Sequence, residues 1–228
     1  MFGKFIVFEG VDGTGKSTAL SHFTTWLKSQ GESFVQTSEP GGTPFAMSLR
    51  AALKNPVFSV NRPPMAELWT VSAARCDHVQ NVIKPALLAG KTVVCDRFTP
   101  STFAYQGEHL PWETIRECNR LATEGLEPGL VIILDVSSET AEKRKKSRGG
   151  ADDSFDSRPD DFWFRTRERY HRYAQENPNV RIVSAEGSPE EVSARIVSAV
   201  VERFPSLQKL PAPTPHAHTP STSVQRHP

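Results

Sequence analysis

The strongest constraint on this chain is a glycine-rich segment close to its N-terminus. Residues 10–17 read GVDGTGKS, which fits the pattern G-x-x-x-x-G-K-[S/T], and they follow directly on the apolar run Phe5–Phe8. A strand that leads through such a turn into a helix points several backbone N–H groups, and the positive end of the helix dipole, at one place. We therefore predict an α/β protein that binds nucleotide phosphates; the alternative is a glycine-rich turn of purely structural use.

Each position of this loop has a physical role. Glycine has no Cβ, so Gly10, Gly13 and Gly15 allow positive φ and a close approach of the backbone to phosphate oxygens. Lys16 brings a compact charge to the β- and γ-phosphates, and the Ser17 hydroxyl is placed to ligate Mg²⁺. We expect ATP to bind along the loop and the start of the helix: Gly10, Val11, Asp12, Gly13, Thr14, Gly15, Lys16, Ser17 and Thr18.

Strand-like apolar runs alternate with helical patterns along the rest of the chain. We predict strands at residues 4–9, 33–37, 92–95, 130–135 and 180–184, and helices at 16–30, within 44–55 and 64–89, near 111–123, and at 138–148, 160–176 and 189–203. This order predicts a parallel five-stranded sheet covered by helices on both faces. In such folds the ligand crevice lies at the carboxyl ends of the strands.

Composition excludes several other classes of protein. The formal net charge is only +1, so the chain has no overall basic field of the kind that marks general nucleic-acid binders. No apolar run reaches the roughly 18 residues of a membrane span, and the N-terminal apolar run is too short for a signal peptide. Cys76, Cys95 and Cys118 are far apart and are expected to be reduced. We expect a cytoplasmic protein with neither membrane nor nucleic-acid partners.

The composition changes near the C-terminus. Residues 1–204 have the pattern of one domain, whereas residues 205–228 are rich in Pro, Ser, Thr and His and contain few apolar side chains. Such a segment does not bury enough apolar surface to offset the entropy lost on ordering. We therefore predict that residues 205–228 form a disordered tail.

The predicted strand at 92–95 leads into Asp96 and Arg97. An aspartate at this edge of the sheet holds Mg²⁺ or orients a neighbour, and an arginine grips phosphate through two parallel hydrogen bonds. An ordinary ion pair at a strand end is the alternative. The chain has no guanine-reading N-K-x-D stretch and no Asp-Glu pair after this strand, which argues against GTPases and motor ATPases.

Several motifs together resemble one family, the thymidylate kinases. The matching segments are FEGVDGTGKST at 8–18, SEPGGT at 38–43, AAR at 73–75, IKPA at 83–86 and DRF at 96–98, followed by Ser101, Thr102 and AYQG at 104–107. They occur in the order and spacing of that family, and with Arg148-Gly149 and RTRERY at 165–170 the similarity runs from residue 3 to about 200. The resemblance implies the P-loop nucleoside monophosphate kinase fold, ATP and Mg²⁺, transfer of phosphate to dTMP, and a homodimer.

The resemblance also implies roles for individual residues. Arg97 would bind the acceptor phosphate, Arg75 and Ser101 would read the edge of the base, and Tyr105 and Gln106 would pack on the deoxyribose and base. The implied dTMP-binding residues are Asp12, Glu39, Pro40, Val71, Arg75, Arg97, Ser101, Tyr105 and Gln106. The implied catalytic residues are Lys16, Arg97, Arg148, Arg158 and Asp12, and the implied metal-organising residues are Ser17, Glu9 and Asp96.

Family members of one type carry a catalytic arginine within the loop, and members of the other type supply arginines from a lid. Here the loop position is Gly13, and a polar interval at 149–158 lies between Arg148 and Arg158. The chain therefore resembles the lid-arginine type. The basic run at 143–146 that precedes the lid is read as a solvated helix face, except for Arg144, which remains open.

Two positions depart from the family pattern. Val71 stands where the family usually has an aromatic ring that stacks on thymine, and Ser38 stands where arginine is common before E-P-G-G-T. These departures leave two alternatives beside a thymidylate kinase: a kinase of another pyrimidine nucleotide or nucleoside, and a non-enzymatic nucleotide-binding protein. The retained Lys16, Ser17 and Arg97 argue against the second alternative.

Overall fold

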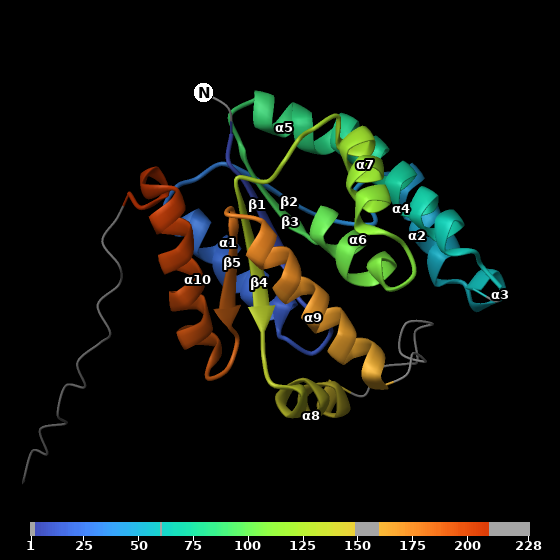
Figure 1. The fold of residues 1–228 in the computed structure, drawn as a ribbon. Coiled ribbons are helices and arrows are strands. Elements are labelled where there is room, and N and C mark those ends of the chain that lie inside the picture. Colours follow the sequence, from blue (N-terminus) through green and yellow to red (C-terminus); the bar gives the residue numbers. More distant parts are fainter. Residues whose placement is uncertain (1–2, 60, 149–159, 210–228) are drawn as a thin grey trace, which may run out of the picture.

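The computed structural model describes residues 3–59, 61–148 and 160–209. Its centre is one five-stranded sheet of order β2-β3-β1-β4-β5 in which every neighbouring pair of strands is parallel. The strands are β1 (Phe5–Glu9), β2 (Phe34–Ser38), β3 (Thr92–Asp96), β4 (Leu130–Asp135) and β5 (Val180–Ser184). The predicted α/β fold is confirmed, with the predicted number of strands (Figure 1).

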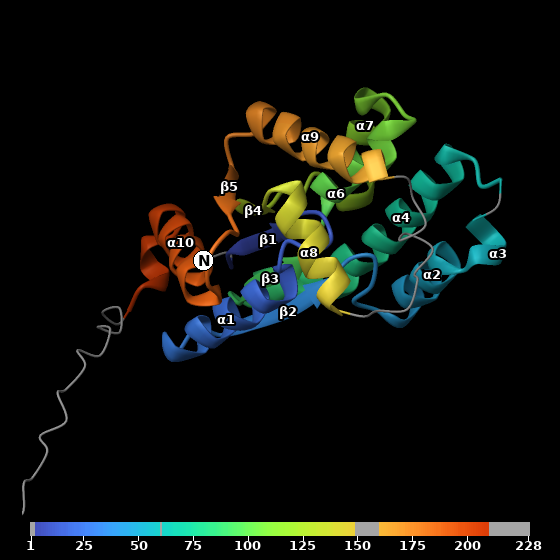
Figure 2. The same cartoon turned by 90° about the horizontal axis from the view of Figure 1, so that it is seen from below.

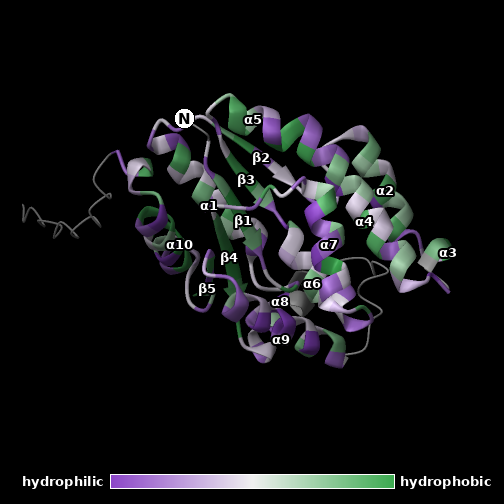
Figure 3. Ribbon diagram, turned by 45° about the horizontal axis from the view of Figure 1, so that its top comes forward, coloured by the Kyte–Doolittle hydropathy of each residue, from purple (hydrophilic) through white to green (hydrophobic). Residues whose placement is uncertain are grey.

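The sheet is buried on both faces because its central strands are apolar throughout residues 5–8, 93–95 and 130–134. In β1, Phe5 and Val7 belong to one hydrophobic cluster, while Ile6 and Phe8 belong to a second cluster. Since successive strand residues point to opposite faces, the two clusters are the two sides of the sheet. The hydropathy colouring shows the same central strands as continuously apolar (Figure 3).

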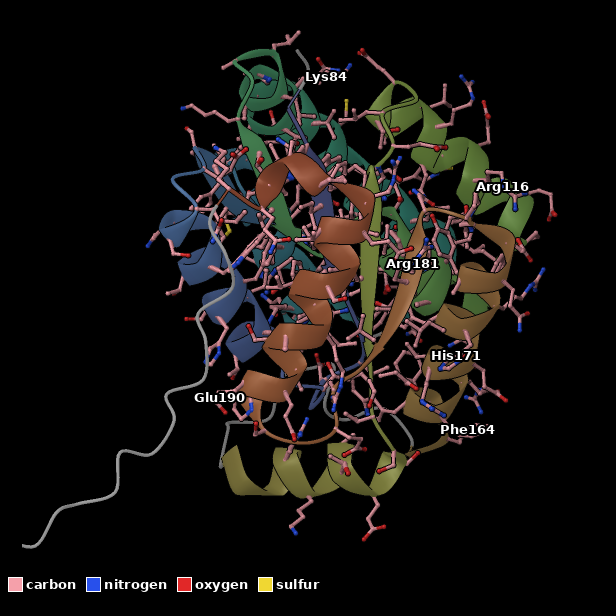
Figure 4. All side chains as sticks on the ribbon, turned by 90° about the vertical axis from the view of Figure 1, so that its left-hand side faces the viewer. Lys84, Arg116, Phe164, His171, Arg181 and Glu190 are labelled. Carbon is pink, nitrogen blue, oxygen red and sulfur yellow. The ribbon has the colours of Figure 1, made fainter. Side chains whose placement is uncertain are left out.

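Helices cover the two faces unequally (Figures 1 and 4). The face of Ile6 and Phe8 is covered by α1 (Lys16–Ser29), α10 (Pro189–Arg203) and a 3₁₀ turn at Pro205–Leu207. The other face is covered by a larger set: α4 (Pro64–His78), α5 (Lys84–Leu88), α6 (Thr99–Tyr105), α7 (Trp112–Thr123) and α9 (Asp160–Glu176). Two further helices, α2 (Pro44–Lys54) and the short α3 (Pro56–Ser59), extend the molecule beside α4.

The carboxyl edge of the sheet collects the loops that follow β1, β2 and β3. The helix α8 (Ser138–Arg148) lies at this edge, close to the loop after β1 (Figures 1 and 2). Candidate site residues from distant parts of the chain therefore meet at one end of the sheet, as expected for parallel α/β folds. Within the described parts of the chain, no helix combines the length and apolar character that crossing a bilayer requires.

The helical stretch predicted at 64–89 is not a single α-helix. It contains a π-helical turn at Val79–Ile83 between α4 and α5. Pro85 lies in the first turn of α5, has no backbone N–H and would clash with the carbonyl four residues earlier. A wider turn before the proline removes that conflict. The short helix α6 was not predicted, because its seven residues are too few to show a helical period.

The predicted domain boundary at residue 204 is wrong by at least five residues. Residues 205–209 are ordered in the structure, and the Leu207 side chain is fully buried in the cluster beneath α1 and α10. The backbone N–H of Lys209 donates to Gln30 Oε1, and Lys209 Nζ lies 2.9 Å from Glu32 Oε2. One buried leucine and these polar contacts outweigh a polar composition. Residues 210–228 lie outside the described part of the chain.

Candidate active site

The loop after β1 has the geometry of a phosphate cradle. Gly10, Gly13 and Gly15 have φ values of 140°, 89° and 86°, which L side chains rarely adopt. At Gly13 there is also no space, because a Cβ there would lie 2.6 Å from the Ala141 carbonyl oxygen of α8. Gly15 caps the N-terminus of α1, whose first turn contains no acidic residue. The open backbone N–H groups and the helix dipole therefore favour an anion at this place.

Lys16, the first residue of α1, lies beside the end of β3. Its Nζ atom is 3.2 Å from Asp96 Oδ1, so the two predicted residues form an ion pair. Burial lowers the pKa of the Lys16 ammonium and the nearby Arg97 charge lowers it further, whereas Asp96 and Asp12 raise it. A bound polyphosphate would add negative charge and favour the protonated lysine.

Arg97 is held in place from several sides. Its φ is 70°, an uncommon backbone conformation for a residue with a side chain, and its N–H donates to the Phe8 carbonyl. The guanidinium donates to Asp12 Oδ1 at 2.9 Å and to the Tyr170 hydroxyl at 3.2 Å, and it lies 5.1 Å from the Tyr105 ring centroid. The structure thus brings Arg97 and Asp12 together, as the two predicted roles require.

The carboxylate of Glu9 accepts four hydrogen bonds within the protein. Its Oε1 accepts hydrogen bonds from the Phe98 and Ser101 N–H groups, and its Oε2 accepts from the Ser101 and Tyr170 hydroxyls. Burial raises the pKa of this carboxyl group. Four donors contact its oxygens, so Glu9 anchors the start of α6 beside Arg97, and its role in organising Mg²⁺ stays a prediction.

A cavity of about 240 Å³ opens beside the phosphate loop. All of the predicted dTMP-binding residues line it: Asp12, Glu39, Pro40, Val71, Arg75, Arg97, Ser101, Tyr105 and Gln106. The Glu39–Pro40 peptide bond is cis, and the Pro40 carbonyl accepts a hydrogen bond from Arg50. Residues from the loop, β2, α4 and α6 that are far apart in the sequence therefore share one pocket.

Arg75 is buried in the pocket wall, and most of its N–H groups donate hydrogen bonds to the protein. Its Nε donates to Glu39 and its Nη2 to the Phe98 carbonyl. Its Nη1 donates to both Thr102 and Asn119. Since a guanidinium has five N–H donors, these four bonds leave one on Nη2 beside the cavity. Arg75 is thus a rigid donor with no acceptor capacity.

A sequence profile of thymidylate kinase matches residues 8–196. The thymidylate kinases of Chromohalobacter salexigens and Desulfovibrio desulfuricans are 40% and 42% identical to this chain, over 90% and 86% of its length and 98% and 94% of theirs. This chain belongs to the thymidylate kinase family. A crystal structure of thymidylate kinase from Ehrlichia chaffeensis matches it with a TM-score of 0.68 at 28% identity, covering 88% of this chain and 99% of that one.

Membership of the thymidylate kinase family makes the valine at position 71 the main question about the pocket. Of the three rings that could replace the missing aromatic, only Phe98 lines the cavity, and it is fully buried against Phe5. Trp69 is 55% exposed and does not line the cavity, and Phe103 packs on Trp112 instead. Val71 therefore presents an aliphatic surface to the cavity.

Ser101 lines the cavity and also has contacts with the residues around Arg97. Its hydroxyl donates to Glu9, lies 3.1 Å from the Tyr170 hydroxyl and accepts weakly from Arg97 at 3.4 Å. Thr102, the next residue, bonds to Arg75 and lines the cavity. Thr102 therefore joins Arg75 in the cavity wall, whereas the Ser101 hydroxyl contacts Glu9, Tyr170 and Arg97.

Sequence reasoning missed several residues of the site. Arg50, Leu53 and Lys54 of α2 line the cavity, and their i, i+3, i+4 spacing on one helix face was the available signal. Glu67 of α4 lines it as well. Tyr170 contacts Glu9, Ser101 and Arg97 from α9, and no local pattern pointed to this contact.

The lid residues can be placed only in part. Arg148 is the last residue of α8, its side chain is outside the described set, and Arg158 and the interval 149–158 also lie outside the described residues. The helix itself packs on the phosphate loop, because Arg144 donates to the Thr14 carbonyl at 3.4 Å and to the Ala185 carbonyl at 3.1 Å. Arg144 is thus tied to backbone oxygens of the loop region.

The oxygen atoms near Lys16 suit Mg²⁺. Ser17 is exposed in the first turn of α1, directly after Lys16. The Asp96 carboxylate contacts Lys16 from the end of β3, and the Asp12 carboxylate contacts Arg97 from the loop. Hydroxyl, carboxylate, phosphate and water oxygens are the ligands that Mg²⁺ prefers. Ser17 and Asp96 therefore remain the candidates for holding the metal.

Proposed function

We propose that the protein transfers the γ-phosphate of ATP to dTMP, giving dTDP, with the help of Mg²⁺. The observation that carries the proposal is the position of the acceptor cavity relative to the phosphate loop. Asp12 of the loop, Asp96 beside Lys16, and Arg97 all line this cavity. Donor and acceptor phosphates bound in the two sites would meet at these residues.

The chemistry needs charge compensation more than proton transfer. The acceptor phosphate has a second pKa of about 6, so it is mostly dianionic at neutral pH and requires no general base. Lys16 and Arg97 would neutralise the approaching phosphates, and Ser17 and Asp96 would hold Mg²⁺, which would supply further positive charge to the donor. Arg148 and Arg158 would add positive charge from the lid and exclude water when the site closes.

The hydrogen-bonding groups of the pocket wall favour a pyrimidine base with a carbonyl group at its edge. Arg75 has one N–H donor left, so the base must present an acceptor to it, as O4 of thymine and uracil does and the amino group of cytosine does not. Tyr105 lies under Arg97 and would pack on the deoxyribose, where it leaves little space for a 2′-hydroxyl.

A kinase of a different pyrimidine nucleotide is the second candidate, because Val71 lacks the stacking surface of an aromatic ring. A coupled assay with ATP, Mg²⁺ and a panel of pyrimidine nucleosides and monophosphates separates the two. We expect dTMP to be the best acceptor. A higher kcat/KM for another acceptor would reassign the substrate and keep the phosphate chemistry.

The first testable change is Lys16→Ala. We expect turnover of dTMP to fall to background, because Lys16 is the positively charged side chain of the phosphate loop and begins α1 beside Asp96. The Lys28→Ala variant, in the last turn of the same helix, is the matched control and should retain activity. Thermal unfolding should show that both variants are folded. ATP binding without phosphoryl transfer to any acceptor in the unaltered protein would contradict the enzyme proposal.

The proposal extends to assembly and location. Phe45 and Met47 of α2 and Trp69 of α4 are each more than half exposed, and these two helices pack on one another. Exposed apolar side chains of this kind favour contact with a second copy of the chain. We propose a cytoplasmic homodimer, and light scattering of the eluting protein during size-exclusion chromatography measures its mass directly.

A further inference from the structure

One hydrogen bond in the pocket wall has no role in the scheme above. Gln106, directly after α6, donates from Nε2 to Glu67 Oε1 of α4 at 2.7 Å. Both residues line the acceptor cavity, and Gln106 is only 8% exposed. The two residues come from separate helices, so the bond depends on how α4 and α6 are packed.

Glu67 decides which way the Gln106 amide is turned. An ionised carboxylate only accepts hydrogen bonds, so the amide must present its nitrogen to Glu67. The reversed orientation would place the amide oxygen against a carboxylate oxygen. Arg62 Nη1 lies 3.6 Å from Glu67 Oε2, so the carboxylate also has a positively charged partner. With the nitrogen fixed on Glu67, the carbonyl oxygen of Gln106 is the acceptor that the amide has left.

Arg75 supplies the complementary half of this pattern on the same cavity. Its remaining N–H is a donor, and the Gln106 carbonyl is an acceptor. The Watson–Crick edge of thymine or uracil carries an acceptor at O4 next to a donor at N3–H. The edge of cytosine carries the reverse pair, an amino donor beside an N3 acceptor. With a donor and an acceptor held in fixed orientation, cytosine makes two mismatches: its amino group faces the Arg75 donor, and its N3 acceptor faces the Gln106 carbonyl.

We propose that Glu67 is a positioning residue for base selection, which acts by holding the Gln106 amide with its carbonyl turned to the base. This rests on the proposed function and names the device that sets its substrate class. Glu67 acts through Gln106, so it has no part in the transfer of the phosphoryl group. A glutamine at position 67 accepts or donates equally well, and the preferred orientation of Gln106 is then lost.

The test is E67Q, assayed with dTMP, dUMP and dCMP at saturating Mg·ATP. The ratio of kcat/KM for dTMP to that for dCMP should fall by about tenfold or more, because one buried hydrogen bond no longer discriminates. The ratio of dTMP to dUMP should stay unchanged, since these two bases share the same edge. E117Q, which makes the same chemical change at an exposed residue of α7, should alter neither ratio.

A double-mutant cycle separates this role from a structural one. Q106L removes the side-chain carbonyl and should itself lower the ratio of kcat/KM for dTMP to kcat/KM for dCMP. In the Q106L background, E67Q should cause no further change in this ratio. The proposal would be overturned if E67Q lowered kcat/KM equally for all three acceptors. It would also be overturned if E67Q changed the ratio of dTMP to dCMP further in the Q106L background. An unchanged ratio in E67Q would also overturn it while leaving the kinase function intact. Failure of the unaltered protein to phosphorylate dTMP would contradict the proposed function instead.

Discussion

At the scale of single residues, the pocket holds its two arginines before any ligand arrives. Arg97 is fixed by Asp12 and Tyr170, and Arg75 by its bonds to Glu39, Thr102, Asn119 and the Phe98 carbonyl. Groups that are already oriented need little reorganisation when charge builds up on the transferring phosphate. The same buried positions explain why Glu9 serves as an anchor: a carboxylate at the end of β1 is surrounded by donors from α6 and α9.

Val71→Phe is the prediction that belongs to this scale. Base–aromatic stacking contributes roughly 1–3 kcal/mol, so a ring at position 71 should tighten dTMP binding by about that amount. Calorimetric titration of both proteins with dTMP measures the difference. Val71→Leu, which enlarges the side chain without adding a ring, is the control and should give a smaller gain. Equal or weaker binding in the phenylalanine variant would mean that another group, such as Phe98, already occupies the stacking position.

At the scale of elements, α8 and α9 connect the lid region to the sheet. Arg144 of α8 bonds to the carbonyl of Thr14 in the phosphate loop, and Arg167 of α9 makes two 2.6 Å bonds to Asp135 at the end of β4. His171, labelled in Figure 4, is on the same helix, and its Nε2 lies 3.2 Å from Asp135 Oδ2. The two helices that flank residues 149–159 are thus each fastened to the carboxyl edge of the sheet.

The lid arginines give the first prediction for these elements. Arg148→Ala and Arg158→Ala should each lower kcat far more than they weaken dTMP binding, because these groups act mainly on the transition state. Steady-state kinetics and a dTMP titration give the two quantities separately. Lys143→Ala, at an exposed position of α8, is the control. Near-normal kcat in both single variants and in the double variant would locate the catalytic charge elsewhere.

The contact between α9 and β4 gives a pH-dependent prediction. Burial alone would raise the pKa of Asp135, but Arg167, with a smaller effect from His171, holds that pKa below its ordinary value. A carboxyl group with a lowered pKa adds stability that is present above its unfolded pKa of about 3.9 and is lost as the pH falls through the folded pKa. Arg167→Gln should cost about 1 kcal/mol at pH 7, since the pair is partly exposed, and little below the folded pKa. Chemical denaturation across this range measures it, and a pH-independent difference would contradict the assignment.

At the scale of the whole molecule, the C-terminal segment completes one of the two cores. Leu207 is fully buried with residues of α1 and α10, and Phe204 packs against the same cluster. Lys209 adds bonds to Gln30 and Glu32 on the far side of α1. The domain therefore ends beyond α10, because without Leu207 a gap would remain in the apolar cluster beneath α1 and α10.

Two truncations test this boundary against each other. Removal of residues 205–228 exposes the site of Leu207 and should destabilise the protein by about 1.5–3 kcal/mol. Removal of residues 210–228 takes away a segment with little apolar content and should leave both stability and turnover unchanged. Thermal and urea unfolding of the two shortened proteins gives the comparison. Equal stability of both would show that Leu207 contributes nothing measurable.

The sequence by itself determined where the strands lie along the chain, that they form a parallel sheet, and where the phosphate loop is. These features depend on local chemistry: apolar runs form buried strands, glycines permit the loop backbone, and residues at the carboxyl ends of parallel strands meet at one edge. The dTMP-binding residues were implied by the resemblance to thymidylate kinases, and every one of them lines the cavity.

Only the tertiary structure decided how these residues are used. Glu9 bonds to Tyr170, 161 residues away in the chain, and Gln106 bonds to Glu67 on a different helix. Arg75 is held by Asn119 of α7, and Leu207 is buried beneath α1. Each of these outcomes depends on which side chains packing brings within hydrogen-bond or contact distance. A hydrogen bond requires a partner at about 3 Å, and for residues so far apart in the chain that distance exists only after the helices have packed on the sheet.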